Sequence, residues 1–275
     1  MRDVPLAAVR GGGDLGTACA LRLIRAGLRL IVAEQSAPTT VRRTVAFSEA
    51  VAEGRIEVEG VIAVRVDSAS DIRTALLNGQ VPVLVDPGLT QVLPLLPDLI
   101  LDATVAKAGT GMTREMAPGT IALGPGFVAG ADVDAVIETN RGPDLGRVIW
   151  NGPAEANTHV PAAVAGHAQD RVLRSPIAGV FQAWNTIGDI VDEDAVVGDV
   201  DGEAVRAPFP GLVRGLLRSG IEVRKGMKVG DLDPRLDVSL CYRVSDKALA
   251  VAGGALEASM MLLSRQGWSL RHAGT

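Results

Sequence analysis

The sequence is poor in aromatic residues, cysteine and histidine, and each shortage excludes a class of protein. Aromatic residues make up 3% of the 275 residues, which leaves few rings for the base-stacking platforms of single-strand nucleic-acid-binding proteins. The two cysteines, Cys19 and Cys241, are far apart in the chain. They exclude a disulfide scaffold and suit a reducing compartment. The three histidines, His159, His167 and His272, lack the spacing of metal ligands, so no metal site is expected.

The sequence also lacks an excess of basic charge and long apolar runs. The net charge is -5, so nothing in the overall charge attracts nucleic acid. The N-terminus shows no signal-peptide pattern, and no apolar run is expected to reach membrane-spanning length. With 47% hydrophobic and 21% charged residues, the composition predicts a cytoplasmic globular protein without a membrane partner. The length allows two domains.

The chain contains one prominent glycine loop, Arg10–Gly16, with the sequence RGGGDLG. An apolar strand is predicted before it at residues 5–9, an amphipathic helix after it at 15–26, and a second strand at 28–33. Gly11, Gly13 and Gly16 have G-x-G-x-x-G spacing, which lets the backbone turn sharply and approach a phosphate. Glu34 ends the second strand, 18 residues after Gly16, where a ribose hydroxyl acceptor is usually found.

The glycine loop is therefore predicted to bind a nucleotide or a similar phosphate-bearing ligand. The same spacing also suits a tight strand-to-helix turn that binds nothing. Two arginines that follow the second strand could meet a 2′-phosphate or lie solvated in a loop. The expected cofactor-binding residues are Gly11, Gly12, Gly13, Asp14, Leu15, Gly16, Glu34, Arg42, Arg43, Asn140 and Arg141.

Strands alternate with short helices along the first 100 residues, which predicts a Rossmann-like, doubly wound parallel sheet. The expected strands lie at 61–66, 81–85, 99–101, 135–138 and 148–150, and the expected helices at 50–52 and 70–77. Five polar residues that follow these strands could converge at one rim of the sheet, or each could form only a hydrogen bond in its own loop or a surface ion pair. They are Asp102, Lys107, Glu138, Asn140 and Arg141. Among them, Asp102 and Lys107 are the candidates for a catalytic acid or base.

A gapless duplication with an offset of 32 residues marks the second half of the chain. Arg174–Val180 matches Arg206–Leu212, which predicts two equivalent β-rich units burying one shared core. The pattern resembles the barrel-sandwich hybrid of biotinyl and lipoyl carrier domains. The hairpin that would display the modified lysine, Asp199–Glu203, contains no lysine. Covalent biotin or lipoate is therefore not expected, and the module is predicted to be a docking or cap domain.

The last part of the chain is predicted to be a strand at 238–244 followed by a helix that Ser245 caps. This helix is expected to return to the N-terminal sheet, and Gly253-Gly254 within it calls for close packing. Cys241 could be a buried apolar cysteine, and Cys19 is expected in the core. The expected domains are a Rossmann-like domain at 1–165, the duplicated domain at 170–235, and a C-terminal strand and helix at 236–275.

Five stretches spread along nearly the whole chain carry a family resemblance. They are Val9–Leu15, Val41–Ala50, Gly124–Phe127, Glu138–Gly142 and Ser245–Ala248. Together they resemble the YqeB-like accessory proteins of selenium-dependent molybdenum hydroxylase systems, which are related in role to the XdhC/CoxF maturation factors. The resemblance implies a cytoplasmic protein that helps prepare or insert the molybdenum cofactor into a hydroxylase client. It supplies no catalytic residues. With molybdenum implied, Cys241 could contact the metal or a sulfur donor instead of lying buried, because soft metals favour thiolates.

Three functions remain open from the sequence. The leading one is an accessory protein whose glycine loop binds a nucleotide or the phosphate of a molybdenum cofactor. The second is an NAD(P)-dependent oxidoreductase, with Glu34 at the ribose and Asp102 or Lys107 as acid or base. The third is a non-catalytic scaffold that docks a client enzyme. Whether the chain is an enzyme stays open, and a homo-oligomer is compatible with each function.

Overall fold

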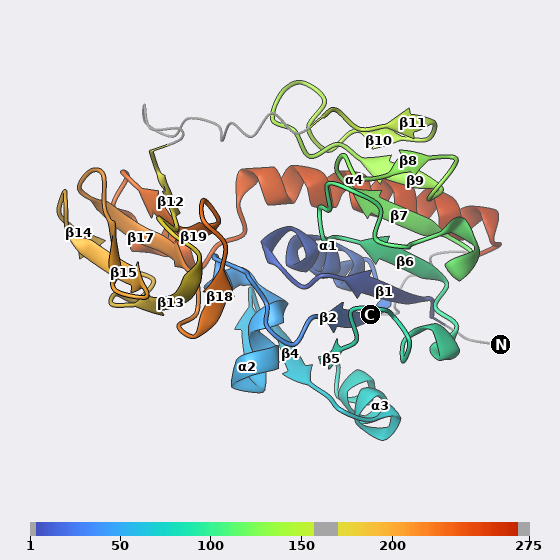
Figure 1. Ribbon diagram of the computed structural model, residues 1–275. Coiled ribbons are helices and arrows are strands. Elements are labelled where there is room, and N and C mark those ends of the chain that lie inside the picture. Colours follow the sequence, from blue (N-terminus) through green and yellow to red (C-terminus); the bar gives the residue numbers. More distant parts are fainter. Residues whose placement is uncertain (1–3, 157–169, 269–275) are drawn as a thin grey trace. The chain divides into compact units, whose positions relative to one another are not determined.

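The structure is a computed structural model, and it describes residues 4–156 and 170–268. The chain divides into two compact units (Figure 1). Unit 1 combines Met1–Ser36, Phe47–Thr158 and Val244–Thr275. Unit 2 combines Ala37–Ala46 and His159–Arg243. The segment just after the second strand therefore belongs to a different unit from the glycine loop.

Unit 1 is built on a nine-stranded sheet with the strand order β10-β9-β7-β6-β1-β2-β5-β4-β3. Its central strand, β1 (Leu6–Arg10), pairs in parallel with β2 (Arg29–Glu34) and β6 (Leu99–Asp102). The other strands are β3 (Arg55–Val58), β4 (Val61–Arg65), β5 (Val81–Val85), β7 (Thr120–Leu123), β9 (Ala135–Ile137) and β10 (Val148–Ile149). Between the two ends of this sheet, the strands β4, β5, β2, β1, β6, β7 and β9 are all parallel, so their C-terminal ends lie at one edge.

The predicted fold class, a Rossmann-like doubly wound parallel sheet with a barrel-sandwich-hybrid domain, is wrong. The sheet is mixed, because β3 pairs antiparallel with β4, and β10 with β9. Glu59 and Gly60 both have positive φ between β3 and β4, as in the two-residue hairpins that join antiparallel strands. The connections after β5, β6 and β7 contain no α-helix, and Pro94 and Pro97 interrupt the first of them. The chain is a mixed α/β protein.

Two helices cover one face of the sheet. These are α1 (Asp14–Arg25) and α4 (Asp246–Arg265), which pack against each other, and α4 also contacts β6, β7, β9 and β10. The Ser245 hydroxyl accepts a hydrogen bond from the Ala248 amide, as its predicted role as N-cap requires. The prediction that this helix returns to the N-terminal sheet is confirmed.

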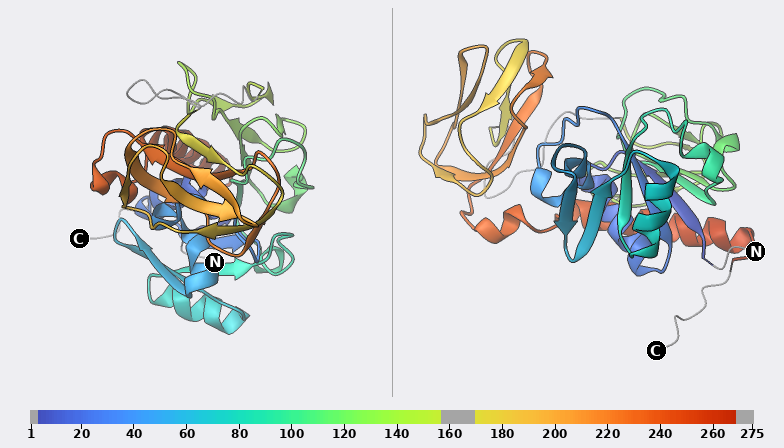
Figure 2. Two further views of the ribbon diagram at one scale, coloured as in Figure 1. Left: turned by 60° about the vertical axis from the view of Figure 1, so that its left-hand side comes forward. Right: turned by 90° about the horizontal axis from the view of Figure 1, so that it is seen from below.

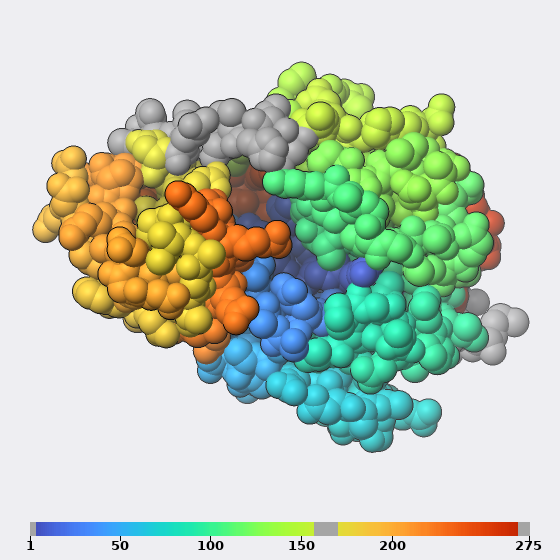
Figure 3. Space-filling model, in the orientation of Figure 1, coloured from blue at the N-terminus to red at the C-terminus, as the bar shows by residue number. Residues whose placement is uncertain are grey.

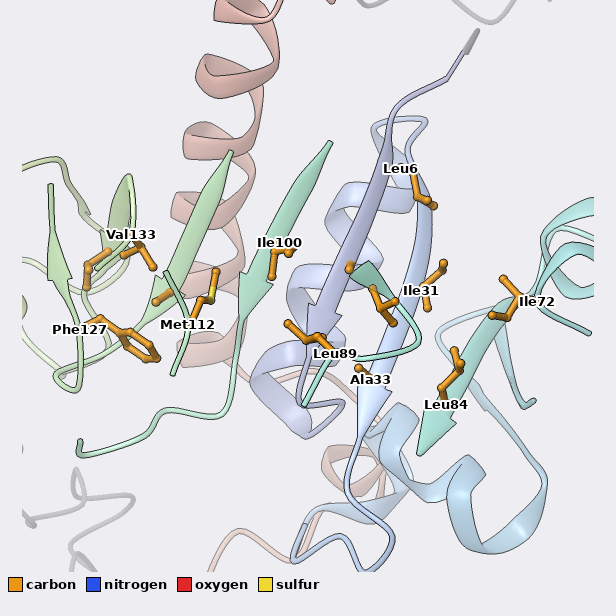
Figure 4. Packing of buried hydrophobic residues seen from close by; sticks show 14 of the residues in the cluster. Leu6, Ile31, Ala33, Ile72, Leu84, Leu89, Ile100, Met112, Phe127 and Val133 are labelled. Atoms are coloured by element: carbon orange, nitrogen blue, oxygen red, sulfur yellow. The ribbon is translucent and has the colours of Figure 1, made fainter. Parts of the chain in front are cut away.

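The opposite face of the sheet is covered by α3 (Ala69–Leu77) and by irregular segments. Figure 4 shows a buried apolar cluster on this face, which includes Leu6, Ile31, Ile100 and Phe127. The remaining short elements of unit 1 are α2 (Ala50–Glu53), η2 (Phe47–Glu49), η3 (Leu93–Leu95), η4 (Arg114–Met116), β8 (Val128–Ala129) and β11 (Gly152–Pro153). Because the connections after β5, β6 and β7 contain no α-helix, loops follow these strands at the C-terminal edge of the sheet.

The two adjacent glycines of α4 have different surroundings. A Cβ on Gly254 would lie 2.0 Å from the carbonyl oxygen of Gly146 and 3.0 Å from a methyl group of Ile137. A Cβ on Gly253 would meet nothing within 4 Å. The predicted close packing is therefore confirmed at Gly254 alone.

Among the described residues, one stretch passes a length and composition test for a membrane-spanning helix. It is Val238–Arg265, and half of its most apolar window is buried inside the protein. The expectation that no apolar run reaches spanning length is wrong by that test. The buried side chains of α4 face α1 and the sheet, as a core helix of a globular unit also would.

Unit 2 contains two four-stranded antiparallel sheets, ordered β12-β19-β17-β14 and β16-β15-β13-β18. The right-hand view of Figure 2 shows these strands in two layers. The first repeat supplies β12 (Val172–Arg174), β13 (Gly179–Ala183), β14 (Ile190–Val191) and β15 (Val196–Val200), and the second supplies β16 (Glu203–Arg206), β17 (Gly211–Leu216), β18 (Ile221–Val223) and β19 (Lys228–Asp233). Each sheet thus takes two strands from each repeat. Both sheets enclose one apolar core, which confirms the prediction that the two repeats bury a shared core.

The two repeats are equivalent down to single hydrogen bonds. The Gly188 amide donates to the Val213 carbonyl at 2.9 Å, and the Gly220 amide, 32 residues later, donates to the Phe181 carbonyl at 2.8 Å. The duplication read from the sequence is therefore an internal symmetry of the folded unit.

The predicted strand at 238–244 is wrong. This segment forms the 3-10 helix η5 (Val238–Cys241), and Asp237 caps it by accepting a hydrogen bond from the Ser239 amide. A second short 3-10 helix, η1 (Arg43–Val45), lies in the other segment of unit 2. An aspartate side chain that accepts a hydrogen bond from the backbone amide two residues later favours such a capped turn over a strand.

Candidate functional site

The glycine loop lies at the edge of the sheet where the parallel strands end. It leaves β1 between the ends of β2 and β6, the strands that flank β1 on either side. The chain passes from β1 to one side of the sheet and later returns to the other side through β6. Open α/β sheets bind ligands at such a reversal, because the two neighbouring connections diverge there.

Three of the four glycines in the loop are required by packing. Gly11 has a φ of +92°, and a Cβ on Gly16 would lie 1.9 Å from the Gly11 carbonyl oxygen. A Cβ on Gly12 would come within 2.9 Å of the Ser48 amide nitrogen. The backbone of the loop is therefore held between neighbouring segments, whereas Gly13, with φ -64° and ψ -175°, has a conformation open to any residue.

The backbone amides of the loop fall into two groups. The Gly11 amide donates to the Ala33 carbonyl at 2.8 Å, and the Gly12 amide donates to Glu34 Oε2 at 2.7 Å. The amides of Gly13 and Asp14, at the first turn of α1, donate no hydrogen bond to any residue in the described ranges. These two N–H groups lie at the positive end of the helix dipole, which suits an anion.

Glu34, the predicted ribose acceptor, holds the backbone of the glycine loop by hydrogen bonds. Its side chain is buried, and Oε1 accepts a hydrogen bond from the Gln35 amide at 2.8 Å while Oε2 holds Gly12. Burial raises the pKa of Glu34 above its ordinary value. Each carboxylate oxygen can accept a second hydrogen bond, so these two backbone amides do not use all of the acceptor capacity of Glu34.

The same arrangement recurs at two other strand ends, of which the sequence indicated only the one at Glu138, as a polar residue that could serve its own loop. Asp86 follows β5 and accepts hydrogen bonds from the amides of Gln91 and Val92, at 2.8 and 3.0 Å. Glu138 follows β9 and accepts from the amides of Asn140 and Glu155, at 2.6 and 2.8 Å. The signal for this role is an acidic residue immediately after an apolar strand. Buried carboxylates thus fix the loops that follow β2, β5 and β9.

Asp102 and Lys107, the candidate acid and base, have different surroundings. Asp102 is fully buried, and its carboxylate binds Arg10 Nη1 at 3.2 Å, the Thr104 amide at 3.0 Å and the Thr110 hydroxyl at 2.8 Å. Lys107 is exposed within the loop whose two ends Asp102 fixes. No hydrogen bond joins the two side chains, so the observed role of Asp102 is to anchor this loop.

Arg42 and Arg43 lie in unit 2, and their side chains donate hydrogen bonds to backbone carbonyls of that unit. Arg42 Nη2 donates to the carbonyls of Leu240 and Arg243 at 3.0 and 2.8 Å, and Arg43 Nε donates to the Leu216 carbonyl at 2.8 Å. These bonds attach the segment 37–46 to the duplicated unit.

Asn140 and Arg141 follow β9 in unit 1. Asn140 Nδ2 donates to Glu155 Oε2 at 2.7 Å. Arg141 forms a two-point ion pair with Asp246 at 2.8 and 3.0 Å, and this hydrogen bonding raises the pKa of Arg141. Arg141 therefore ties the β9 loop to the start of α4.

Both cysteines are buried. Cys19, in α1, is fully buried, and burial raises the pKa of its thiol to about 12, which confirms its predicted place in the core. Cys241 is buried in η5, and burial raises its pKa as well. Within residues 4–156 and 170–268, no three histidine, cysteine, aspartate or glutamate side chains are grouped to hold a metal ion. All three histidines lie outside the described residues.

The space-filling view gives the loop's surroundings on one face of the protein. Figure 3 shows the dark blue of the first part of the chain at the surface, beside the green of the segment that follows β6. Gly13, Asp14 and Leu15 are each half-buried. The start of α1 is therefore partly exposed to solvent within unit 1.

Known proteins give one similarity over nearly the whole chain. No protein-family model matches the sequence. The "Uncharacterized protein YqeB" of Escherichia coli K12 is 46% identical over 258 residues, which are 94% of this chain and 48% of YqeB. The chain is thus similar to YqeB over nearly all of its own length, and it spans about half the length of that relative.

Solved structures give only loose likenesses. An aspartoacylase family protein from Mesorhizobium loti is 14% identical with a TM-score of 0.27, covering 83% of this chain and 85% of that protein. A succinylglutamate desuccinylase/aspartoacylase from Rhodobacter sphaeroides is 15% identical with a TM-score of 0.26, covering 84% and 86%. At these scores the likeness defines no common fold. Neither structure is named as a Rossmann or molybdenum-maturation protein.

Proposed function

We propose that unit 1 binds a small phosphate-bearing ligand at the first turn of α1. The observation that carries this proposal is the pair of amides at Gly13 and Asp14, which donate to no described residue, whereas the Gly11, Gly12 and Leu15 amides do. Two adjacent N–H groups at a helix N-terminus bind phosphate oxygens well, because the helix dipole favours negative charge there.

Two further features support a ligand at this point rather than a turn that binds nothing. The loop lies where the strand order reverses, at the edge where all the parallel strands end. Its backbone is already fixed by Glu34 and by the packing of Gly12 against Ser48. A fixed loop loses little conformational freedom on binding, which favours affinity.

The charge next to the free amides bears on the kind of ligand. The Asp14 carboxylate lies at the first position of α1, and Oδ1 accepts a hydrogen bond from the Leu15 amide at 3.0 Å. A carboxylate so close to a phosphate repels it, so the amides must offset this repulsion, or a cation must accompany the ligand. Nucleotides and pterin phosphates with a bound divalent cation fit this requirement.

The role of the ligand in the cell is carried by the family resemblance alone. On that basis we infer an accessory protein for a molybdenum hydroxylase, with the ligand being a nucleotide or the phosphate of the molybdenum cofactor. An NAD(P)-dependent oxidoreductase would use the same loop with Glu34 at the ribose. A panel of ligands separates these roles, because a nicotinamide cofactor and a pterin share only the phosphate.

The test compares two substitutions at one residue. Proline is favoured at the first position of a helix, and the extended backbone of Gly13 suits a residue that precedes proline. Asp14→Pro therefore removes one free amide without breaking α1, and Asp14→Ala removes the same carboxylate but keeps the amide. Thermal unfolding is followed with NAD, NADP, ATP, CTP and a molybdopterin source, each with and without Mg²⁺.

We expect at least one of these compounds to raise the unfolding temperature of the wild type and of Asp14→Ala, but not of Asp14→Pro. Without added cation, Asp14→Ala should bind more tightly than the wild type, because the repelling carboxylate is gone. Equal binding by Asp14→Pro would place the ligand elsewhere. No response of the wild type to any compound would favour the scaffold.

A further inference from the structure

Unit 2 carries opposite charges on its two equivalent repeats. Residues 174–205 contain one basic and seven acidic side chains, whereas residues 206–237 contain seven basic and four acidic ones. The fold treats the two repeats alike, since corresponding strands take corresponding places in the two sheets. The difference in charge is therefore not required by the architecture.

The inversion is sharpest at one pair of equivalent turns. The turn between β14 and β15 begins with Asp192 and Glu193, and the turn between β18 and β19 begins, 32 residues later, with Arg224 and Lys225. In each turn the fourth residue's amide bonds the first residue's carbonyl, at 3.2 and 3.0 Å. The third residue has positive φ in both, +62° at Asp194 and +79° at Gly226.

The neighbours of the two turns are equivalent as well. Arg206 Nη1 donates to the Asp194 carbonyl at 2.8 Å, and Arg174 Nη1 donates to the Gly226 carbonyl at 2.9 Å. The two turns therefore present the same backbone shape in the same setting. They differ in the charge that they expose.

These charges are available to a partner. Asp192, Glu193, Arg224 and Lys225 are all exposed. Their side chains form no hydrogen bond or ion pair with any residue of the described part of the chain. Two exposed patches of opposite sign on one chain are complementary to each other in a second copy, since each patch can face its opposite.

We propose that two copies of this chain associate through unit 2, with the acidic turn of one copy against the basic turn of the other. A twofold dimer requires that residue i of one copy contacts residue j of the other and that j contacts i. Acidic and basic turns on the same chain satisfy this condition twice, once in each direction. The proposal is independent of the glycine loop and its ligand.

The test exchanges the charges and then mixes the variants. Asp192→Lys with Glu193→Lys makes both turns basic, and Arg224→Glu with Lys225→Glu makes both turns acidic. The full-length proteins are studied by sedimentation velocity over a range of concentrations, in low and in raised salt. Exposed ion pairs are individually weak, so the loss of all of them should weaken association by about tenfold.

We expect the wild type to associate at low salt and less so at raised salt, and each variant alone to associate about tenfold more weakly than the wild type. An equimolar mixture of the two variants should associate again, because every contact in the mixed pair is complementary. A control with Glu203→Lys and Glu222→Lys, two exposed residues outside these turns, changes the net charge equally and should associate as the wild type does. A monomeric wild type, or variants that associate alone as the wild type does, would overturn the proposal.

Discussion

Glu34 Oε2 accepts a hydrogen bond from the Gly12 amide at 2.7 Å, across 22 residues of sequence. This bond joins the end of β2 to the loop that follows β1. The other carboxylate oxygen of Glu34, Oε1, accepts a hydrogen bond from the Gln35 amide at 2.8 Å. One buried side chain thus fixes the backbone at both Gly12 and Gln35. The shape of the glycine loop depends on this carboxylate before any ligand is present.

Glu34→Gln should destabilise the protein. A glutamine amide offers one oxygen and one NH₂ group, so one of the two backbone amides would face a donor and lose its partner. Leaving a buried donor without a partner costs about 1–3 kcal/mol. Urea unfolding measures the change, and Glu257→Gln, on an exposed part of α4, is the control that should leave the free energy of unfolding unaltered.

The same substitution should change how stability depends on pH. Burial raises the pKa of Glu34 above its ordinary value of 4.5, so the folded protein holds this proton more tightly than the unfolded chain does. The contribution to stability is then complete below pH 4.5 and is lost as the pH rises through the folded-state pKa. The stability of the wild type relative to Glu34→Gln should fall over that window. A difference that rises with pH would contradict the raised pKa.

The adjacent glycines of α4 should respond oppositely to alanine. Gly253→Ala adds a methyl group into open space within a helix, which should stabilise the protein by about 0.5–1 kcal/mol. Gly254→Ala would place the methyl group against Gly146 and Ile137, and such overpacking should destabilise it by about 1–3 kcal/mol. Chemical denaturation of the two variants side by side measures both changes. Equal effects would mean that α4 does not lie against the Gly146 loop.

Asp102→Asn should loosen the loop that carries Lys107. The substitution removes the charge that pairs with Arg10 and weakens the acceptor for Thr104 and Thr110. Removing one partner of a buried ion pair costs about 3–5 kcal/mol, and here part of that loss should appear as local opening. Hydrogen exchange should speed up at residues 103–110 more than at β5. Uniform acceleration would instead mean a purely global effect.

The sequence predicts the elements of unit 1 where local pattern and tertiary environment agree. The strands that became β1, β2 and β5, and the helices that became α1 and α4, combine clear apolar periodicity with capping residues or glycine stops. The strand β3 was missed because Arg55 and Glu57 give it the polarity of a loop, yet its hairpin to β4 needs only Glu59 and Gly60. Edge strands have solvent on one side, so their apolar signal is weak.

At the candidate site, too, the sequence predicted the local features but not those that depend on tertiary contacts. The spacing of Gly11 and Gly16 indicated a sharp turn, and the packing of the two residues against each other gives the steric reason. Spacing could not assign Arg42 and Arg43 to unit 2, because residues close in sequence can belong to different compact units. Nor could it show that Asp102 is enclosed by Arg10, Thr104 and Thr110, since those contacts form only in the folded chain.

The interleaved strands of unit 2 bear on its origin. Because each sheet draws two strands from each repeat, a lone copy of 32 residues would leave both layers half built and its strand edges bare. Before the gene segment doubled, two separate chains would have had to interlock to make this structure. The covalent link that followed converted an encounter between molecules into a step within one molecule, and freed each half to acquire its own surface.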